Sequence, residues 1–135
     1  MIQVILYSGF LDLIVGLDEL TRIVKNPEAN REWHSSLSEV AGVYLIVDTG
    51  TGDQYVGSAY GEKGIMGRWG DYVRTGHGGN AKLKAMLSVD PDVRHRFQFT
   101  VLRTLSKTLT RREVIEFESL HKRKLGTKAF GLNVN

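Results

Sequence analysis

Apolar and polar residues follow two different patterns along the first 40 residues, one typical of strands and one typical of helices. Short apolar runs at Ile2–Leu6 and Leu11–Val15 predict two brief strands. Between residues 17 and 24 the apolar positions recur at helical spacing until Asn26–Pro27 ends the pattern. A second short helix is expected at Glu28–Leu37. The chain is therefore expected to open with two strands followed by two helices.

The next segment carries the clearest hairpin pattern in the sequence. Gly42–Asp48 is rich in β-branched and aromatic residues, and a polar turn at residues 49–53 separates it from a second strand at Gln54–Ser58. Because side chains alternate faces along a strand, a turn with an even number of residues would place Tyr44 and Tyr55 on the same face. Two readings follow: a plain cross-strand aromatic pair, or two hydroxyls that converge where a water molecule could be held.

The second half of the chain predicts two helices, a strand and a long final helix. Their expected ranges, in chain order, are residues 65–73, Asn80–Leu87, Arg96–Thr104 and Thr110–Gly126. A capping box of Thr110 and Glu113 opens the last helix, and Gly126 is its expected C′ residue. From residue 41 to residue 135 the order ββααβα predicts an α+β fold, in which helices flank a small, mainly antiparallel three-stranded sheet. Residues 1–40 are expected to be an N-terminal extension or the end of a preceding domain.

The composition excludes several classes of site and location. The chain has no cysteine, so it can form neither a disulfide framework nor a thiolate metal site. It has no apolar run of the roughly 18 residues that a membrane span needs, and no signal-peptide pattern at its start. Phosphate-binding, dinucleotide-binding and serine-hydrolase motifs are also absent from the sequence. These features predict a cytoplasmic protein without a membrane partner.

Charge is distributed unevenly along the chain. Residues 1–62 carry three Lys/Arg against nine Asp/Glu, a local charge of −6, whereas residues 94–135 carry ten against three, a local charge of +7. A basic surface on an otherwise nearly neutral protein is typical of polyanion binding, although solvated lysine-rich helix faces would give the same count. The distribution alone therefore leaves nucleic-acid binding and an incidental charge pattern both open.

One carboxylate in the final helix stands out on a helical wheel. Glu118 falls within the apolar stripe that contains Val114 and Leu125, whereas Glu116 lies on the opposite side, where it would face water. A buried carboxylate needs a cation, because an unpaired buried charge is costly. That cation can be an arginine or lysine partner, or a metal such as Mg²⁺.

The basic and imidazole side chains give weaker signals. Arg68 borders the apolar face of its helix, and its guanidinium has the geometry to bind a phosphate with two hydrogen bonds. The four histidines have no zinc-type spacing. Only His77 lies in a glycine-rich loop where a substrate could approach.

Taken together, these residues resemble the GIY-YIG nuclease superfamily. Its name-giving motifs correspond to Gly42–Val43–Tyr44 and Tyr55–Val56–Gly57, joined by a short hairpin. The arginine that the family places on the following helix corresponds to Arg68, in the context Arg68–Trp69. The family's later glutamate and asparagine correspond to Glu118 and Asn133, fifteen positions apart. The five signature positions are thus filled in order, over about residues 41–135.

The sequence departs from the family pattern at two positions. Val43 replaces the usual isoleucine, which is a conservative change, and Tyr72 stands where some members carry a histidine. The second departure leaves open which group assists proton transfer.

The resemblance implies a metal-dependent endonuclease that hydrolyses phosphodiester bonds in DNA. Glu118 would hold one Mg²⁺ or Mn²⁺, and Arg68 would bind the phosphate. Tyr44 or Tyr55, in the first place Tyr44, would position or deprotonate the attacking water, and Asn133 would orient one of these groups. The expected nucleic-acid contacts are Tyr72, His77, Lys82, Lys84, Arg111, Arg112 and Lys122. The expected partners are DNA and either an additional DNA-binding domain or a second copy of the chain.

Two other functions are compatible with the same residues. One is a catalytically silent nucleic-acid-binding module with the same fold, and the other is a structural α+β domain whose charge asymmetry is incidental. The nuclease interpretation depends on a spatial expectation: two phenols, a guanidinium and a carboxylate, far apart in the chain, must gather in one pocket beside a basic surface.

Overall fold

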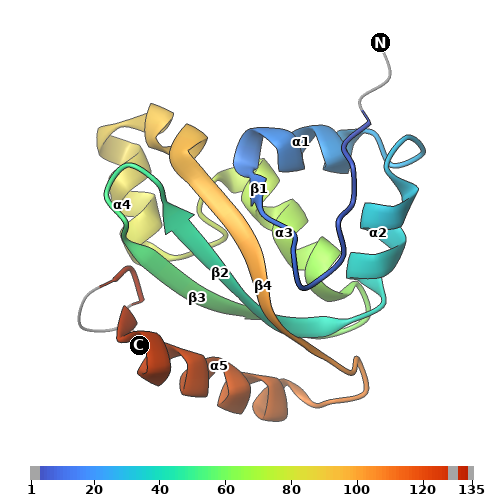
Figure 1. Cartoon of the computed structure of the whole chain (residues 1–135). Coiled ribbons are helices and arrows are strands. Elements are labelled where there is room, and N and C mark those ends of the chain that lie inside the picture. Colours follow the sequence, from blue (N-terminus) through green and yellow to red (C-terminus); the bar gives the residue numbers. More distant parts are fainter. Residues whose placement is uncertain (1–3, 128–130, 134–135) are drawn as a thin grey trace.

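The computed structural model describes residues 4–127 and 131–133, which form an α+β fold (Figure 1). The strands form one antiparallel sheet of order β1-β4-β2-β3. Its strands are β1 (Val15–Gly16), β2 (Ala41–Asp48), β3 (Gln54–Ala59) and β4 (Phe97–Leu105). The helices are α1 (Leu17–Lys25), α2 (Arg31–Ser38), α3 (Gly64–Thr75), α4 (Ala81–Val89), the 3₁₀ helix η1 (Pro91–Arg96) and α5 (Arg111–Leu125). Among the described residues, no helix is both long and apolar enough to cross a membrane.

The predicted elements of the second half are confirmed, with bounds that differ by one or two residues from the predicted ones. The side chain of Asn80 accepts a hydrogen bond from the backbone N–H of Leu83 at the start of α4. Thr110 and Glu113 form the capping box of α5, and Gly126 ends that helix in the left-handed conformation. The local capping chemistry therefore set these boundaries as the sequence indicated.

The two predicted N-terminal strands are wrong for the residues that the structure describes. Residues 4–14 form no strand, and of Leu11–Val15 only Val15 pairs, with Phe99 of β4, as the start of a two-residue fourth strand. The backbone of Ile5 in this segment instead forms hydrogen bonds with side chains at the start of α2 and within it. The N–H of Ile5 donates to Asn30 at 2.9 Å, and the Ile5 carbonyl accepts from the Trp33 indole at 2.7 Å. The apolar residues of this segment therefore pack against helices, and the segment does not pair with a strand.

Helices cover the two faces of the sheet unequally (Figure 1). The helices α1, α2 and α3 lie on one face, and α5 lies across the other. Leu20 of α1, Trp33 of α2 and Trp69 of α3 join Tyr44 of the sheet in one buried cluster. Each such side chain contributes about 1.5–3 kcal/mol when fully buried. Residues 13–37 therefore share one hydrophobic core with the sheet, and they support the helix that carries Arg68.

The register of the central hairpin explains both glycine motifs. Tyr44 pairs with Gly57, and Ile46 pairs with Tyr55, so Tyr44 and Tyr55 lie diagonally on the same face, as the sequence predicted. A Cβ atom at Gly57 would lie 2.5 Å from the Tyr44 hydroxyl oxygen. A Cβ atom at Gly42 would lie 2.4 Å from the carbonyl oxygen of Arg103, next to a bulge in the β2–β4 pairing. Both glycines therefore allow close approaches that any larger residue would block.

Candidate active site

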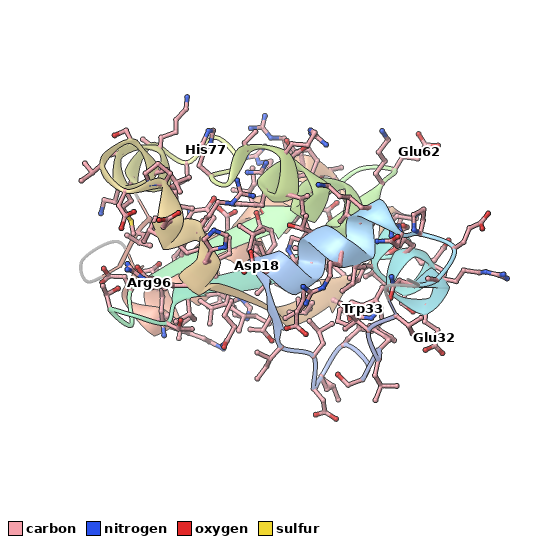
Figure 2. The ribbon with its side chains drawn as sticks, turned by 90° about the horizontal axis from the view of Figure 1, so that it is seen from above. Asp18, Glu32, Trp33, Glu62, His77 and Arg96 are labelled. Carbon is pink, nitrogen blue, oxygen red and sulfur yellow. The ribbon has the colours of Figure 1, made fainter. Side chains whose placement is uncertain are left out.

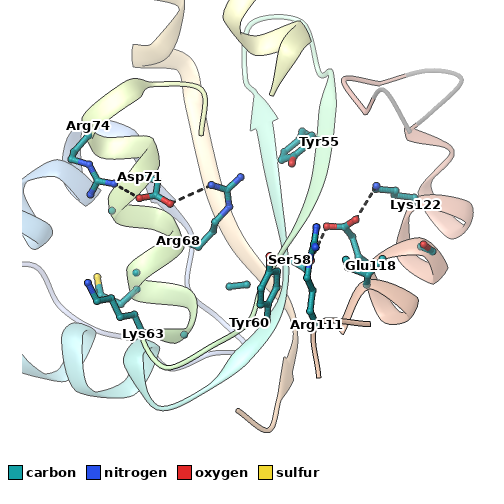
Figure 3. Close-up of a pocket in the computed structure, with 17 residues that line it drawn as sticks. Tyr55, Ser58, Tyr60, Lys63, Arg68, Asp71, Arg74, Arg111, Glu118 and Lys122 are labelled. Carbon is teal, nitrogen blue, oxygen red and sulfur yellow. Dashed lines mark hydrogen bonds and ion pairs between the residues drawn. The ribbon is translucent and has the colours of Figure 1, made fainter. Parts of the chain in front are cut away.

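A pocket with a volume of about 810 Å³ wraps around the edge strand β3, between α3 and α5 (Figure 3). Tyr55 contributes from β3, Arg68 from α3 and Glu118 from α5. Because β3 is the last strand of the sheet, helices that lie on opposite faces can both reach its outer edge. The structure thus brings together one of the two phenols, the guanidinium and the carboxylate in a single pocket.

Tyr44 lies behind this pocket rather than in its wall. Its side chain is 0% exposed, and the rings of Trp69 and Tyr72 pack against it edge-on, with centroids 6.1 and 5.9 Å away. Its hydroxyl lies 3.0 Å from the Tyr72 hydroxyl. Burial raises the pKa of Tyr44 well above its ordinary value, and the nearby Tyr55 raises it further. The expectation that both phenols gather in one pocket is therefore corrected for Tyr44, which is buried and does not line the pocket.

The prediction that Tyr72 contacts nucleic acid is also corrected, because the residue is buried. The residue is 0% exposed, and burial raises the pKa of its hydroxyl well above the usual value. A fully buried ring offers no surface to nucleic acid, so Tyr72 is not a direct contact in this structure. It instead supports Tyr44 through their shared hydroxyl contact, and it packs beneath Arg68, whose guanidinium carbon lies 5.0 Å from the ring centroid.

Arg68 is oriented by the glycine-rich loop after α3. Its Nη2 donates to the carbonyl of Gly78 at 2.7 Å, and its Nη1 donates to Asp71 at 3.3 Å. Gly78 has φ +55°, and a Cβ atom there would lie 2.6 Å from the Tyr72 ring. Only glycine can bring this carbonyl so close, so the loop and the helix together fix the guanidinium. Figure 3 shows Arg68 reaching from α3 toward β3.

The pocket wall carries more positive than negative charge. Besides Arg68, it contains Lys63 and Arg74 of the α3 region and two basic residues of α5, against two carboxylates. Burial acts to lower the pKa of Arg68, but the surrounding phenols Tyr44, Tyr72 and Tyr55 outweigh burial and raise it above the ordinary value. Arg68 therefore stays cationic. Such a pocket attracts an anion.

Glu118 has two partners in the pocket. Its Oε1 accepts a hydrogen bond of 2.8 Å from the Ser58 hydroxyl, and its Oε2 lies 2.9 Å from Nζ of Lys122 one helical turn later. The side chain is 16% exposed and faces the pocket. Of the two cations that the sequence left open for Glu118, the structure shows the lysine. Glu116 is exposed, as expected.

The donor set determines which metal the pocket would fit. No group of three or more His, Cys, Asp or Glu side chains that could hold a metal is found in residues 4–127 and 131–133. That excludes a metal caged by such side chains within these residues. Mg²⁺ keeps most of its waters and needs only one or two carboxylates. Glu118, a single carboxylate facing an open pocket beside a hydroxyl, fits such an ion if Lys122 gives up its contact.

Asn133 lies outside the pocket, at the outer edge of β3. Its Oδ1 accepts from the N–H of Val56 and its Nδ2 donates to the Val56 carbonyl, both at 2.8 Å. Leu132 adds a backbone hydrogen bond of 2.7 Å to the carbonyl of Gln54. Asn133 thus replaces the neighbouring strand that an edge strand lacks. Because Val56 follows Tyr55 directly, these hydrogen bonds hold the strand that carries Tyr55, and the orienting role of Asn133 stays a prediction.

Replacing Asn133 with alanine is expected to destabilise the fold by about 1–3 kcal/mol, because it leaves two buried backbone groups of Val56 without partners. Urea unfolding followed by circular dichroism measures the change. An unaltered unfolding midpoint would show that the contact between the C-terminal segment and β3 does not contribute to stability.

The other predicted nucleic-acid contacts are dispersed. His77 lies beyond the C-terminal end of α3, opposite to the end near Glu62 (Figure 2). The Nδ1 atom of His77 accepts from the N–H of Gly79 at 2.8 Å. Burial, and then Lys84, lower the pKa of His77, so its neutral form is favoured at neutral pH. Lys82 donates to the carbonyl of Gly131 at 3.2 Å.

The basic residues of α5 separate into two groups. Arg111 and Lys122 line the pocket, and Lys122 is largely buried against Glu118. Arg112 is exposed and lies outside the pocket wall. Lys84 on α4 is likewise exposed and outside it.

Six further residues with polar or charged side chains line the pocket that sequence reasoning did not select. They are Ser58, Tyr60, Lys63, Asp71, Arg74 and Ser119. A signal was available for the α3 members, because positions 63, 67, 68, 71 and 74 recur at helical spacing on the face next to Arg68. No sequence signal pointed to Ser58 or Tyr60, whose role depends on where α5 crosses the sheet.

Comparison with known proteins gives the fold an independent match. No protein-family model matches the sequence, and no curated protein does. One solved structure, the catalytic domain of the intron endonuclease I-TevI in a mutant form, matches with a TM-score of 0.55 at 24% identity, over 71% of this chain and 94% of that one. A second structure of the catalytic domain, described as that of a homing endonuclease, matches with a TM-score of 0.51 at 26% identity, over 70% and 98%. The chain has a GIY-YIG-like fold.

Within this GIY-YIG-like fold, the two name-giving motifs lie side by side. Gly42–Val43–Tyr44 belongs to β2 and Tyr55–Val56–Gly57 to β3, and the antiparallel register sets Tyr44 against Gly57. The α+β architecture inferred from the sequence is confirmed. The observed sheet has four strands instead of the three that the sequence predicted, because the two-residue strand β1 is added to it.

Proposed function

We propose that this chain is a metal-dependent endonuclease that hydrolyses phosphodiester bonds in DNA. The observation that carries the proposal is the convergence of Tyr55, Arg68 and Glu118 on one basic pocket, although they come from three elements and span 64 positions of the chain. The similarity to an endonuclease catalytic domain supports the same reaction class. The excess of cations in the pocket wall favours a polyanionic substrate.

Each residue has a distinct part in the proposed reaction. Arg68, held by Gly78 and the Tyr72 ring, binds a non-bridging phosphate oxygen and stabilises the charge that grows there. Glu118 is the residue that would hold Mg²⁺ or Mn²⁺, and a bound metal supplies charge neutralisation near the scissile phosphate. Of Tyr44 and Tyr55, Tyr55 is the one that lines the pocket, so we assign to it the positioning of the attacking water.

Tyr44 and Tyr55 should respond differently to loss of the hydroxyl. Tyr55→Phe is expected to lower the cleavage rate about 100-fold with little change in stability, because the hydroxyl acts in the pocket. Tyr44→Phe is expected to cost about 1 kcal/mol of stability, because it removes a buried hydrogen bond to Tyr72. Single-turnover cleavage and thermal unfolding, measured on both variants, separate the two effects. The assignment fails if Tyr55→Phe cleaves at the unmodified rate.

The proposed function is tested most directly by incubating the chain with supercoiled plasmid and Mg²⁺ or Mn²⁺. Nicked circles are expected first, because one pocket cuts one strand, and a linear product requires a second visit or a second copy of the chain. EDTA should abolish cleavage. Salt-dependent DNA binding without any cleavage would instead identify a catalytically silent binding module. That alternative is favoured by one observation, the ion pair of Glu118 with Lys122, which already satisfies the carboxylate.

A further inference from the structure

Tyr60 presents an aromatic ring at the pocket, directly after β3. The side chain is 45% exposed, and it lines the same pocket as Arg68 and Glu118. The guanidinium carbon of Arg111, at the start of α5, lies 5.6 Å from the centre of the ring. Figure 3 shows the two side chains next to each other. Tyr60 thus comes from the end of β3 and Arg111 from the start of α5.

Neither burial nor helix electrostatics favours the placement of these two side chains. A large aromatic ring that remains half exposed loses part of the free energy that burial would provide. Arg111 occupies the first position of α5, where the positive end of the helix repels a cation. Arg112 follows with the same charge, and no carboxylate forms an ion pair with Arg111 among the residues that the structure describes. A negatively charged ligand would relieve this local repulsion.

A nucleotide matches both side chains. An exposed aromatic ring stacks on the flat face of a base, and a guanidinium pairs with the phosphate of the same nucleotide or adds a second stacking surface. In continuous duplex both faces of each base are covered by the neighbouring base pairs. Only a base that is unpaired, or has left the stack, can therefore lie on Tyr60.

We propose that Tyr60 and Arg111 form a subsite for an unpaired nucleotide next to the scissile phosphate. This inference rests on the proposed function, since the scissile phosphate is placed by Arg68. It narrows the substrate class to DNA with a single-stranded or distorted segment beside the cut. The preference is set by stacking at the pocket and requires no base-specific hydrogen bond.

Equilibrium binding in EDTA tests the subsite without cleavage. Three DNAs of equal length are compared: a continuous duplex, the same duplex with a two-nucleotide unpaired segment, and a single strand. Each unpaired segment or strand carries 2-aminopurine, whose fluorescence falls when it stacks. The DNAs with unpaired nucleotides are expected to bind about 5-fold to 100-fold tighter than the duplex, with quenching, as the free energy of stacking one base implies. Tyr60→Leu should remove both the preference and the quenching, whereas Tyr60→Phe should keep both.

Arg111→Ala and Arg112→Ala provide a matched pair of charge changes. Both residues are exposed neighbours on α5, but only Arg111 lines the pocket and lies over Tyr60. Arg111→Ala should reduce the preference for unpaired DNA. Arg112→Ala should weaken binding to the three DNAs by a similar factor, because it removes charge alone.

Each outcome of these measurements decides the inference. Equal affinity of the unmodified chain for the three DNAs, no detectable binding, or a preference that survives Tyr60→Leu overturns the subsite. Plasmid cleavage with Mg²⁺ is measured separately, so the subsite can fail while the proposed nuclease function stands. An unmodified chain that shows the Tyr60-dependent preference but never cleaves supports the subsite on a silent binding module.

Discussion

Glu118→Gln is expected to lower the rate of DNA cleavage by on the order of 1,000-fold, because it removes the pocket carboxylate that we propose as the metal ligand. Glutamine keeps the shape of the side chain and an oxygen that can accept the 2.8 Å hydrogen bond from Ser58. The fold and the basic wall should therefore persist, and DNA affinity in EDTA should change little. Single-turnover cleavage with saturating Mg²⁺ measures the loss.

Glu116→Gln is the matched control for that change. It alters the same charge on the same helix, two positions away, but Glu116 is exposed and does not line the pocket. It should cleave at close to the unmodified rate. Mn²⁺ titration of the DNA-free chain adds a second readout, since Glu118→Gln should weaken Mn²⁺ binding and Glu116→Gln should not. Equal cleavage by both variants would remove Glu118 from the proposed mechanism.

The ion pair of Glu118 with Lys122 bears on how the metal would enter. The ammonium group lies 2.9 Å from the carboxylate and therefore neutralises it in the metal-free chain. A largely buried carboxylate without a cation would be costly, so the lysine stabilises this state of the pocket. In the proposed reaction Glu118 would hold the metal in place of this contact with Lys122.

The sequence predicted those parts of the fold that depend on local chemistry. The hairpin faces, the α4 and α5 caps and the burial of Glu118 follow from strand alternation, capping residues and helical spacing, which act within a few positions. The N-terminal strands failed because alternating apolar residues pack equally well against helices, and the choice depends on Asn30 and Trp33, more than 20 positions away.

The sequence could indicate which residues belong to the candidate site, but not which of them are buried behind the pocket. Spacing placed Tyr44 and Tyr55 on one face, but it could not show that Trp69 and Tyr72 would cover Tyr44 and leave Tyr55 in the pocket. That outcome depends on how α3 packs across the sheet, and α1 and α2 help to set it from the N-terminal side. The sequence likewise could not predict that the ring of Tyr60 is exposed at the pocket, because this also depends on how the helices pack on the sheet.

Arg68→Ala is expected to reduce the cleavage rate by about 100-fold to 1,000-fold, because it removes the guanidinium that Gly78 and Asp71 hold in the pocket. Its side chain is 29% exposed, and its hydrogen bond to Gly78 fixes the direction in which it points. Arg68→Lys should recover only part of the rate, since an ammonium group keeps the charge but cannot bind two phosphate oxygens in one plane. Rates are compared by single-turnover cleavage, with thermal unfolding as a check of the fold.

Arg74→Ala distinguishes a positioned guanidinium from general positive charge. Arg74 lies on the same helix, lines the same pocket and pairs with the same Asp71, but its side chain is 68% exposed. An exposed ion pair contributes little to stability, so this variant should fold normally and cleave within about 3-fold of the unmodified rate. If Arg68→Ala and Arg74→Ala lowered cleavage equally, and high salt lowered it in the same way, the pocket would act only by attracting DNA. A deficit confined to Arg68, and insensitive to salt at saturating protein, would show that this residue acts on the scissile phosphate.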